Sequence, residues 1–222
     1  GDILHSKSDL SPECIDLTYN FFKSIATIMP LVIIPGNHDM NMNNKNRLDS
    51  ITPILADLHQ THPVYYLQES GVYLYSNLVL NNKGSQSSHS LDAGIGERVV
   101  HKQCETGNLN LNEKQREALK MIALYHGRVN GCELFNGIKL EGEISSNKKT
   151  ITHTDFAGYD LGLCGDIHKQ QDITTTGNVA YAGSLIQQNM GETLEGHGVL
   201  KWSVKSGTYK FKEIPNDFGY IT

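Results

Sequence analysis

The chain has 222 residues, of which 38% are hydrophobic and 19% charged, and 21 of them are glycine. This balance is typical of a globular, loop-rich protein and excludes a disordered polypeptide. No run of about 18 apolar residues occurs, so we expect neither a membrane-spanning helix nor a membrane partner. The formal net charge of -5 argues against a protein that holds nucleic acid by charge alone, but not against an enzyme whose bound cations supply positive charge.

The first predicted elements are a helix and a strand. Residues 11–13, Ser-Pro-Glu, form a good helix start, with a capping serine and a proline in the first turn. Apolar residues then recur on one face over residues 14–29, and Pro30 ends the helix. The continuous apolar run at residues 31–34 predicts a short strand that is buried on both faces.

Short strands and turns dominate the rest of the predicted structure. We expect strands within residues 65–80, 121–125, 161–164, 179–181 and 199–214, and a second helix over 112–120. Residues 84–108 are polar and lack periodicity, which indicates a flexible loop or an insertion. Early alternation of helix and strand, followed by hairpins, favours a mixed α/β sandwich in which sites gather where strands end.

Four cysteines are scattered along the chain and form no Cys-X-X-Cys pair, so a zinc ribbon or a redox motif is not indicated. We expect reduced, structural thiols and therefore an intracellular protein, cytoplasmic or nuclear and not secreted. The cysteines are Cys14, Cys104, Cys132 and Cys164.

Polar residues that can bind metals follow three of the apolar runs directly, and a fourth group lies at the start of the chain. The groups are Gly1-Asp2-Ile3-Leu4-His5, Gly36-Asn37-His38-Asp39, Tyr125-His126-Gly127 and Gly165-Asp166-Ile167-His168. A carboxylate can bridge two divalent cations, while amide oxygens and imidazole nitrogens fill the remaining positions. Two such ions can clamp a phosphate and activate water, and a histidine that binds no metal can protonate the leaving oxygen.

In this order the four groups resemble four of the five motifs of the calcineurin-like metallophosphoesterases. Gly-Asp-X-X-His at residues 1–5, the segment 181–192 and the segment 214–220 are similar to the SbcD-type DNA repair exonuclease branch. The resemblance covers nearly the whole chain apart from the long loop. It implies a four-layer α/β/β/α sandwich of two mixed sheets flanked by helices, formed by residues 1–222 without the family's first strand, and a capping domain beyond residue 222.

The resemblance also implies a set of metal ligands. Asp2 would bridge two ions, Asn37, His126 and Asp166 would bind one of them, and His168 the other. Two features depart from the family. No Asp-X-His precedes Asp2, which suggests a truncated sequence or a degenerate protein. Asp166 stands where the first His of Gly-His-X-His is usual, so the site either keeps this ligand with altered metal preference or loses it.

Three further residues would assist catalysis according to the resemblance. His38 would be the catalytic imidazole that helps the leaving group, and Asp39 would orient it. His5 would contact the phosphate or help to position His38. The ordinary interpretations stay open: residues 37–39 could be turn residues, His126 a structural histidine, Asp166 a helix cap and His5 a surface residue.

These observations predict a manganese-dependent DNA exonuclease or endonuclease in DNA repair, with magnesium, iron or zinc as other metals. A general phosphomonoesterase, a cyclic-nucleotide phosphodiesterase and a non-catalytic scaffold are the alternatives. The partners implied by the resemblance are single- or double-stranded DNA ends, a coiled-coil ATPase of the SbcC/Rad type and a second copy of the chain.

Overall fold

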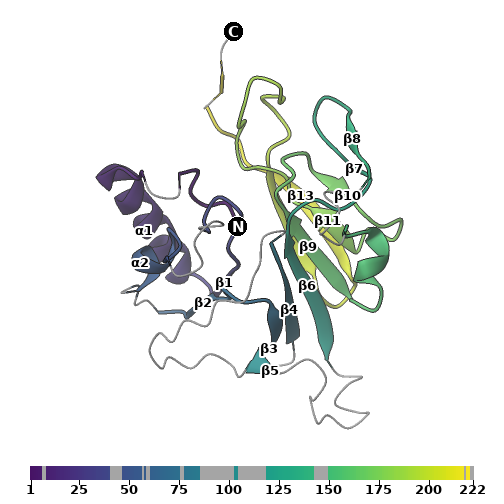
Figure 1. The fold of residues 1–222 in the computed structure, drawn as a ribbon, viewed down its shortest axis with the longest axis horizontal. Helices are drawn as coiled ribbons and strands as arrows, with labels where there is room; N and C mark the ends of the chain where they lie inside the picture. Colours follow the sequence, from purple (N-terminus) through teal and green to yellow (C-terminus); the bar gives the residue numbers. More distant parts are fainter. Residues whose placement is uncertain are drawn as a thin grey trace.

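The computed structural model describes residues 1–6, 9–40, 47–56, 58, 61–75, 78–85, 103–104, 119–142, 150–217 and 219–220. Within these ranges the protein has a mixed α/β structure with several sheets and few helices, which confirms the predicted class (Figure 1). No helix in the described ranges is long and apolar enough to cross a membrane.

Helix α1 spans Pro12–Ala26, and its start confirms the predicted cap: the Ser11 Oγ accepts a hydrogen bond from the Cys14 N–H at 3.2 Å. The helix buries Thr18, Phe22 and Ala26 on one face and ends three residues before the predicted position. Helix α2, Thr52–Leu55, was not predicted.

The largest sheet has seven strands in the described residues. In spatial order they are β10 (Gln171–Asp172), β11 (Val179–Tyr181), β9 (Leu161–Gly165), β6 (Lys120–His126), β4 (Leu78–Ser85), β3 (Gly71–Tyr75) and β5 (Gln103–Cys104). The neighbours among β11, β9, β6 and β4 pair parallel, whereas β10, β3 and β5 pair antiparallel.

Three smaller sheets in the part of the chain that the structure describes have two strands each. They are the parallel pair β1 (Leu31–Ile33) and β2 (Val64–Tyr66), the hairpin β7 (Cys132–Glu133) and β8 (Lys139–Leu140), and the hairpin β12 (Gly198–Ser203) and β13 (Thr208–Glu213). A 3-10 helix, η1, spans His153–Phe156.

The large sheet is covered on both faces. Side chains alternate along its central strand β6, so they enter a different cluster on each face. Ala123 and Tyr125 pack into one cluster together with Phe156 of η1. Ile122 and Leu124 point to the opposite cluster, which also contains side chains of β2 and β12. The strands that carry the site are therefore held rigidly from both sides.

The layers follow from these clusters. Tyr65 of β2 packs against the large sheet, while Phe22 of α1 packs on Ile33 of β1 and Ile54 of α2 packs near Tyr66 of β2. The order is thus helices, β1–β2 sheet and large sheet, as Figure 1 shows from one side to the other. In the described residues the outer face of the large sheet is covered by η1 and the β7–β8 hairpin, so a fourth, helical layer stays a prediction.

Most predicted strands are confirmed, including the two or three short strands expected within residues 65–80, which are β2, β3 and β4 and extend over residues 64–85. The strand at residues 31–34 is present, but its predicted burial is wrong, because Val32 is 39% exposed. The predicted loop at 84–108 begins inside β4 and contains β5, and its other residues lie outside the described ranges. Residues 112–118 of the predicted second helix also lie outside them, and Lys120 begins β6.

Candidate metal centre

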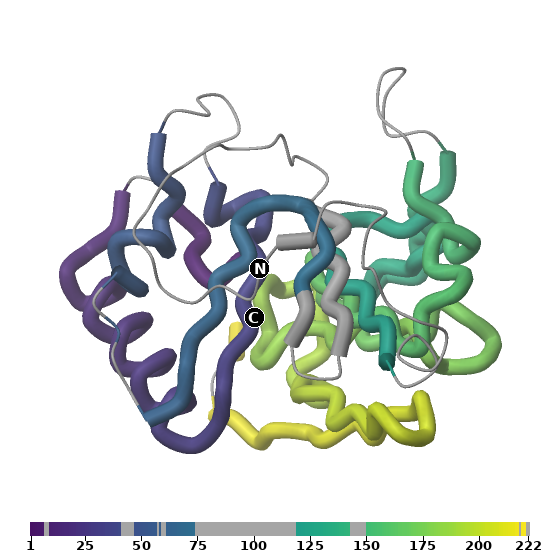
Figure 2. The backbone as a smooth tube through the Cα atoms, turned by 90° about the horizontal axis from the view of Figure 1, so that it is seen from below, coloured from purple at the N-terminus to yellow at the C-terminus, as the bar shows by residue number. Residues whose placement is uncertain are grey.

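The candidate site lies where strands of the large sheet meet the N-terminal segment. His126, the last residue of β6, pairs with Gly165, the last residue of β9, and Asp166 follows directly. The carboxyl ends of these parallel strands therefore share one edge of the sheet. Asn37 comes from the loop after β1, and the N-terminus lies between the helical part and the large sheet in both Figure 1 and Figure 2.

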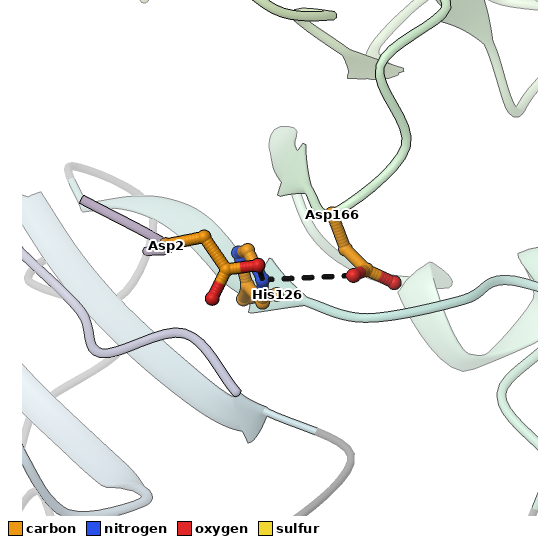
Figure 3. Close-up of side chains that lie close together, drawn as sticks. All are labelled: Asp2, His126 and Asp166. Carbon is orange, nitrogen blue, oxygen red and sulfur yellow. Dashed lines mark ion pairs between the residues drawn. The ribbon is translucent and has the colours of Figure 1, made fainter. Parts of the chain in front are cut away.

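The imidazole of His126 is the centre of the cluster. Its Nε2 lies 2.9 Å from Asp2 Oδ2, 3.2 Å from Asn37 Oδ1 and 3.7 Å from Asp166 Oδ1. Ligand atoms of Asp2, His126 and Asp166 all lie within 4.8 Å of one another. Figure 3 shows the two carboxylates on either side of the ring. The His126 side chain is 2% exposed but the carboxylates are 24% and 27% exposed, so the cluster is open to solvent on the acidic side.

The three oxygens and the Nε2 of this cluster are donor atoms that suit a divalent cation. A protonated Nε2 could donate to only one of the three oxygens that face it. Burial raises the pKa of the Asp166 carboxyl, and the charge of Asp2 adds to this effect although His126 opposes it. Burial also opposes ionisation of Asp2, but its hydrogen bond and charge interaction with His126 leave its pKa lowered. A cation would neutralise both carboxylates and use the Nε2 lone pair, so the residues present fit such an ion.

The backbone at both carboxylates is unusual. Asp2 has a φ of 57° and Asp166 a φ of 91°, and these are the only non-glycine residues with positive φ in the described ranges. Such conformations cost free energy and persist where the surrounding structure imposes them, and they concentrate at functional sites. Both side chains are thereby turned toward His126.

Glycines allow the segments of the site to approach closely. A Cβ at Gly36 would lie 2.2 Å from the Asp2 nitrogen, and a Cβ at Gly1 would lie 2.5 Å from the Gly36 nitrogen. A Cβ at Gly165 would lie 3.0 Å from the His126 Nδ1. This nitrogen has no hydrogen-bond partner among the described residues, so the groups that face Nε2 decide which ring nitrogen carries the proton.

Asp39 ties the N-terminal segment to the loop after β1. Its side chain is fully buried and accepts four backbone hydrogen bonds. Oδ2 accepts from the N–H groups of Asp2 at 2.7 Å and Gly36 at 2.9 Å, and Oδ1 accepts from those of Ile3 and Leu4, both at 3.0 Å. The sequence predicted that Asp39 orients His38. In the structure its hydrogen bonds hold Asp2 in place instead, and none of those in the described part joins it to His38.

His38 lies beside the cluster rather than inside it. Its backbone N–H donates to Asp2 Oδ1 at 2.7 Å, and its Nδ1 lies 3.1 Å from the His5 carbonyl oxygen. A carbonyl only accepts, so it favours a proton on Nδ1 and leaves Nε2 as the nitrogen that can exchange a proton with a substrate. The rings of His5 and His38 are stacked, with centroids 4.9 Å apart. His5 therefore contacts His38 through both its backbone and its ring.

His168 is held by a buried carboxylate. Its Nδ1 lies 2.7 Å from Glu192 Oε1, and the Glu192 side chain is only 3% exposed. The same carboxylate accepts from Asn189 Nδ2 at 2.6 Å and from the backbone N–H of Gln188 at 2.9 Å. A carboxylate that accepts from one ring nitrogen presents the other as a free lone pair, as in many metal-binding histidines.

Viral proteins are among those similar in sequence to this chain. No family model matches the chain. The chain is 39% identical over 222 residues to "Uncharacterized protein R555" of Acanthamoeba polyphaga mimivirus, which covers all of the chain and 15% of that protein. It is 23% identical over 214 residues to "Putative phosphoesterase 078R" of Invertebrate iridescent virus 3, which covers 96% of the chain and 54% of that protein.

The distant relative supports a phosphoesterase-type family at most. Its name refers to phosphoester chemistry in that protein. In this chain, Asp2, His126 and Asp166 form a group that could hold a metal ion. The names specify neither a DNA substrate nor a repair role. The chain spans 15% of the length of the first relative and 54% of the length of the second.

Four predicted ligands, Asp2, Asn37, His126 and Asp166, come together in the structure, whereas His168 is not among the residues of the close cluster. Their binding of metal stays a prediction. The sequence assigned no role to Glu192. Glu192 and His168 are 24 residues apart in the sequence, so no local pattern reveals that they form a hydrogen bond.

Proposed function

We propose that the protein is a metal-dependent phosphodiesterase of the calcineurin-like type that cleaves DNA as an exonuclease or endonuclease, as in DNA repair. The observation that carries the proposal is the convergence of three oxygens on the Nε2 of His126, between two carboxylates in strained backbone conformations. The distant phosphoesterase relative supports the reaction type. The DNA substrate rests on the resemblance of the motif set and of the segments that follow it.

Asp2, Asn37, His126 and Asp166 would hold one divalent ion, and Asp2 and His168 would contribute to a second. Manganese is the proposed metal, because oxygen-rich sites with imidazole suit it, and magnesium, iron and zinc are the other candidates. When bound, such ions supply neutralisation of the phosphate charge and a water acidic enough to attack at neutral pH.

The remaining chemistry falls to the histidine beside the cluster. The His5 carbonyl favours a proton on Nδ1 of His38, so Nε2 is the nitrogen that would take up a second proton and pass it to the leaving oxygen. Asp39 would act by holding Asp2 in position, because its carboxylate accepts a hydrogen bond from the Asp2 backbone N–H. His5 would limit the motion of the His38 ring by stacking on it.

DNA ends are the proposed substrate, and a coiled-coil ATPase and a second copy of the chain are proposed partners. These partners follow from the resemblance, and they would bring positive surface that a chain of net charge -5 does not supply. The four-layer sandwich and the capping domain are proposed on the same ground.

The test combines metal binding with cleavage. We expect the protein to bind Mn²⁺ in calorimetry and to cleave end-labelled DNA. His126→Asn should reduce Mn²⁺ affinity by more than about 100-fold, because loss of a ligand should exceed the 10- to 100-fold cost of losing a residue that supports one. His153→Asn, which changes an exposed histidine of η1, is the matched control and should behave as wild type.

Two results would contradict the proposal in different ways. If the wild-type protein binds no divalent ion, the site is not a metal centre and a scaffold role is favoured. If it binds Mn²⁺ and hydrolyses bis-p-nitrophenyl phosphate but not DNA, the chemistry stands and the substrate is a small phosphoester.

A further inference from the structure

A pocket of about 300 Å³ opens beside the metal cluster. It lies between the turn of the β7–β8 hairpin, the end of the β9 loop and the segment that carries Glu192. Its lining shares residues with the candidate site and adds an apolar wall. These lining residues include Leu134, Phe135, Asn136, Asp166, His168 and Asn189. Because Asp166 belongs to both the cluster and the pocket, a group in the pocket would lie next to a phosphate bound at the cluster.

The charges of the pocket disfavour an anionic occupant. Its carboxylates are Asp166 and Glu192, and the ammonium group of Lys169 is paired with Glu133. A second phosphate would therefore meet acidic groups and a cation that is already neutralised. A neutral group with an apolar face and a polar edge fits better, and the volume is at the lower end of ordinary small-ligand pockets, which hold about 300–1,000 Å³.

The aromatic wall is held in place from behind. The ring centroid of Phe135 lies 5.9 Å from that of His197, with the planes tilted by 38°. His197 is 2% exposed and is fixed at both nitrogens, with Nε2 2.7 Å from the Thr193 carbonyl oxygen and Nδ1 3.0 Å from Ser184 Oγ. Phe135 is thus a preorganised platform for a flat ring, and it loses little freedom when one binds.

We propose that this pocket receives the nucleobase of a nucleotide adjoining the scissile phosphate, with the base on the ring of Phe135. The NH₂ group of Asn136 can donate to the edge of the base, since among the described residues only its Oδ1 is used, by the Ile138 N–H. Asn189 bonds Glu192 and the Gly191 N–H through its amide and keeps one N–H for the base. This inference rests on the proposed phosphodiesterase function and adds a base-binding subsite to it. Stacking accepts any base, because every base has a π-face, so the subsite would select nucleotides without selecting sequence.

The experiment separates base binding from general damage. Fluorescent trinucleotides would carry either all three bases or a tetrahydrofuran abasic unit on the 5′ or the 3′ side of the scissile phosphate. With Mn²⁺ and wild-type protein, removal of the base on one of the two sides should lower kcat/KM by about 5- to 100-fold, the worth of one stacked base. Phe135→Ala should cause a similar loss on the intact substrate and none on that abasic substrate.

Two variants serve as controls. Phe135→Tyr keeps the ring and should restore turnover of the intact trinucleotide. Ile138→Ala changes a 55% exposed residue of the same hairpin turn that does not line the pocket, and it should leave both substrates unaffected. A change in folding would appear as a lower thermal midpoint of Phe135→Ala.

The outcomes are distinguishable. If Phe135→Ala lowers kcat/KM equally on intact and abasic substrates, or changes neither, the base subsite is wrong while the phosphodiesterase proposal stands. If the wild-type protein with Mn²⁺ hydrolyses neither the trinucleotides nor bis-p-nitrophenyl phosphate, the proposed function fails and the subsite fails with it.

Discussion

Replacement of Asp39 by asparagine tests how the N-terminal segment is held at the site. The wild-type carboxylate accepts two backbone hydrogen bonds at each oxygen, from Asp2 and Gly36 at Oδ2 and from Ile3 and Leu4 at Oδ1. Asparagine has almost the same shape, but one of the two positions becomes an NH₂ group. In either orientation of the amide, two backbone N–H groups then face a donor instead of an acceptor.

The magnitude follows from the two lost bonds. A hydrogen bond to a charged group contributes about 1.5–3 kcal/mol, so two of them contribute about 3–6 kcal/mol. A neutral amide is easier to bury than a carboxylate, which offsets part of this loss. We therefore expect Asp39→Asn to lower the free energy of unfolding by about 3 kcal/mol, a large part of the 5–15 kcal/mol that is usual for a domain.

The assay is urea unfolding in the presence of a chelator, followed by Mn²⁺ titration of the folded variant. Asp217→Asn is the control, because Asp217 is exposed and its charge change is the same. We expect weaker Mn²⁺ binding only in Asp39→Asn, because Asp2 is no longer seated. If the variant unfolds at the wild-type urea concentration and binds Mn²⁺ normally, the backbone bonds of Asp39 do not hold the site together.

Two further predictions concern other carboxylates. Glu192→Gln should weaken Mn²⁺-dependent activity by about 10- to 100-fold. The amide has one acceptor in place of two, so an NH₂ group faces either His168 and Asn189 or the Gln188 N–H, and the neutral oxygen holds the His168 ring less firmly. Glu195→Gln on the exposed surface should have no such effect, and equal rates for both variants would contradict this. Asp166→Asn should stabilise the metal-free protein at neutral pH. The pKa of Asp166 is raised in the fold, chiefly by burial with Asp2 adding, so its ionised form destabilises the fold as pH rises above the ordinary carboxyl pKa. With Mn²⁺ the order should reverse, and urea midpoints with chelator and with metal would show whether it does.

The strands that carry the site were predictable because burial leaves a local signature. The runs that became β6 and β9 are continuous and apolar, as expected for strands covered on both faces, and each leads directly into a polar residue, His126 or Asp166. Once parallel strands are recognised, their carboxyl ends must meet at one edge. The convergence of these two side chains thus followed from local patterns together with the rules of sheet geometry.

Short elements escaped prediction because they contain too few residues to show a periodic pattern. Helix α2 has only four residues, and its start depends on the Asp49 carboxylate, which accepts from the N–H groups of Ile51 and Thr52. The β7–β8 hairpin has two residues in each strand, too few for any alternation to be recognised. The pocket beside the site was missed for the same reason, because that hairpin supplies its Phe135 wall.

The site residues can also be divided into those that a short motif reveals and those that only the fold reveals. Asp2, Asn37 and His126 belong to short motifs whose residue types already indicate metal chemistry. Glu192 ends the segment 181–192 that resembles the exonuclease branch, but the resemblance gave it no role, and its importance comes from a hydrogen bond to His168 and from burial. The support that Asp39 gives to the N-terminal segment was missed as well, because it acts on backbone N–H groups, which every residue of that segment possesses regardless of its side chain.

The positive φ at position 166 restricts how this site can diverge during evolution. Asparagine, aspartate and histidine enter the left-handed region more readily than other side chains, and glycine enters it freely. Three of these four residues can donate to a metal. Exchange between the histidine usual in the family that the chain resembles and the aspartate found at this position therefore follows a path that the backbone permits. Substitutions that the backbone tolerates at position 166 are therefore mostly side chains able to bind a metal, and glycine is the one that would remove the carboxylate without straining the chain.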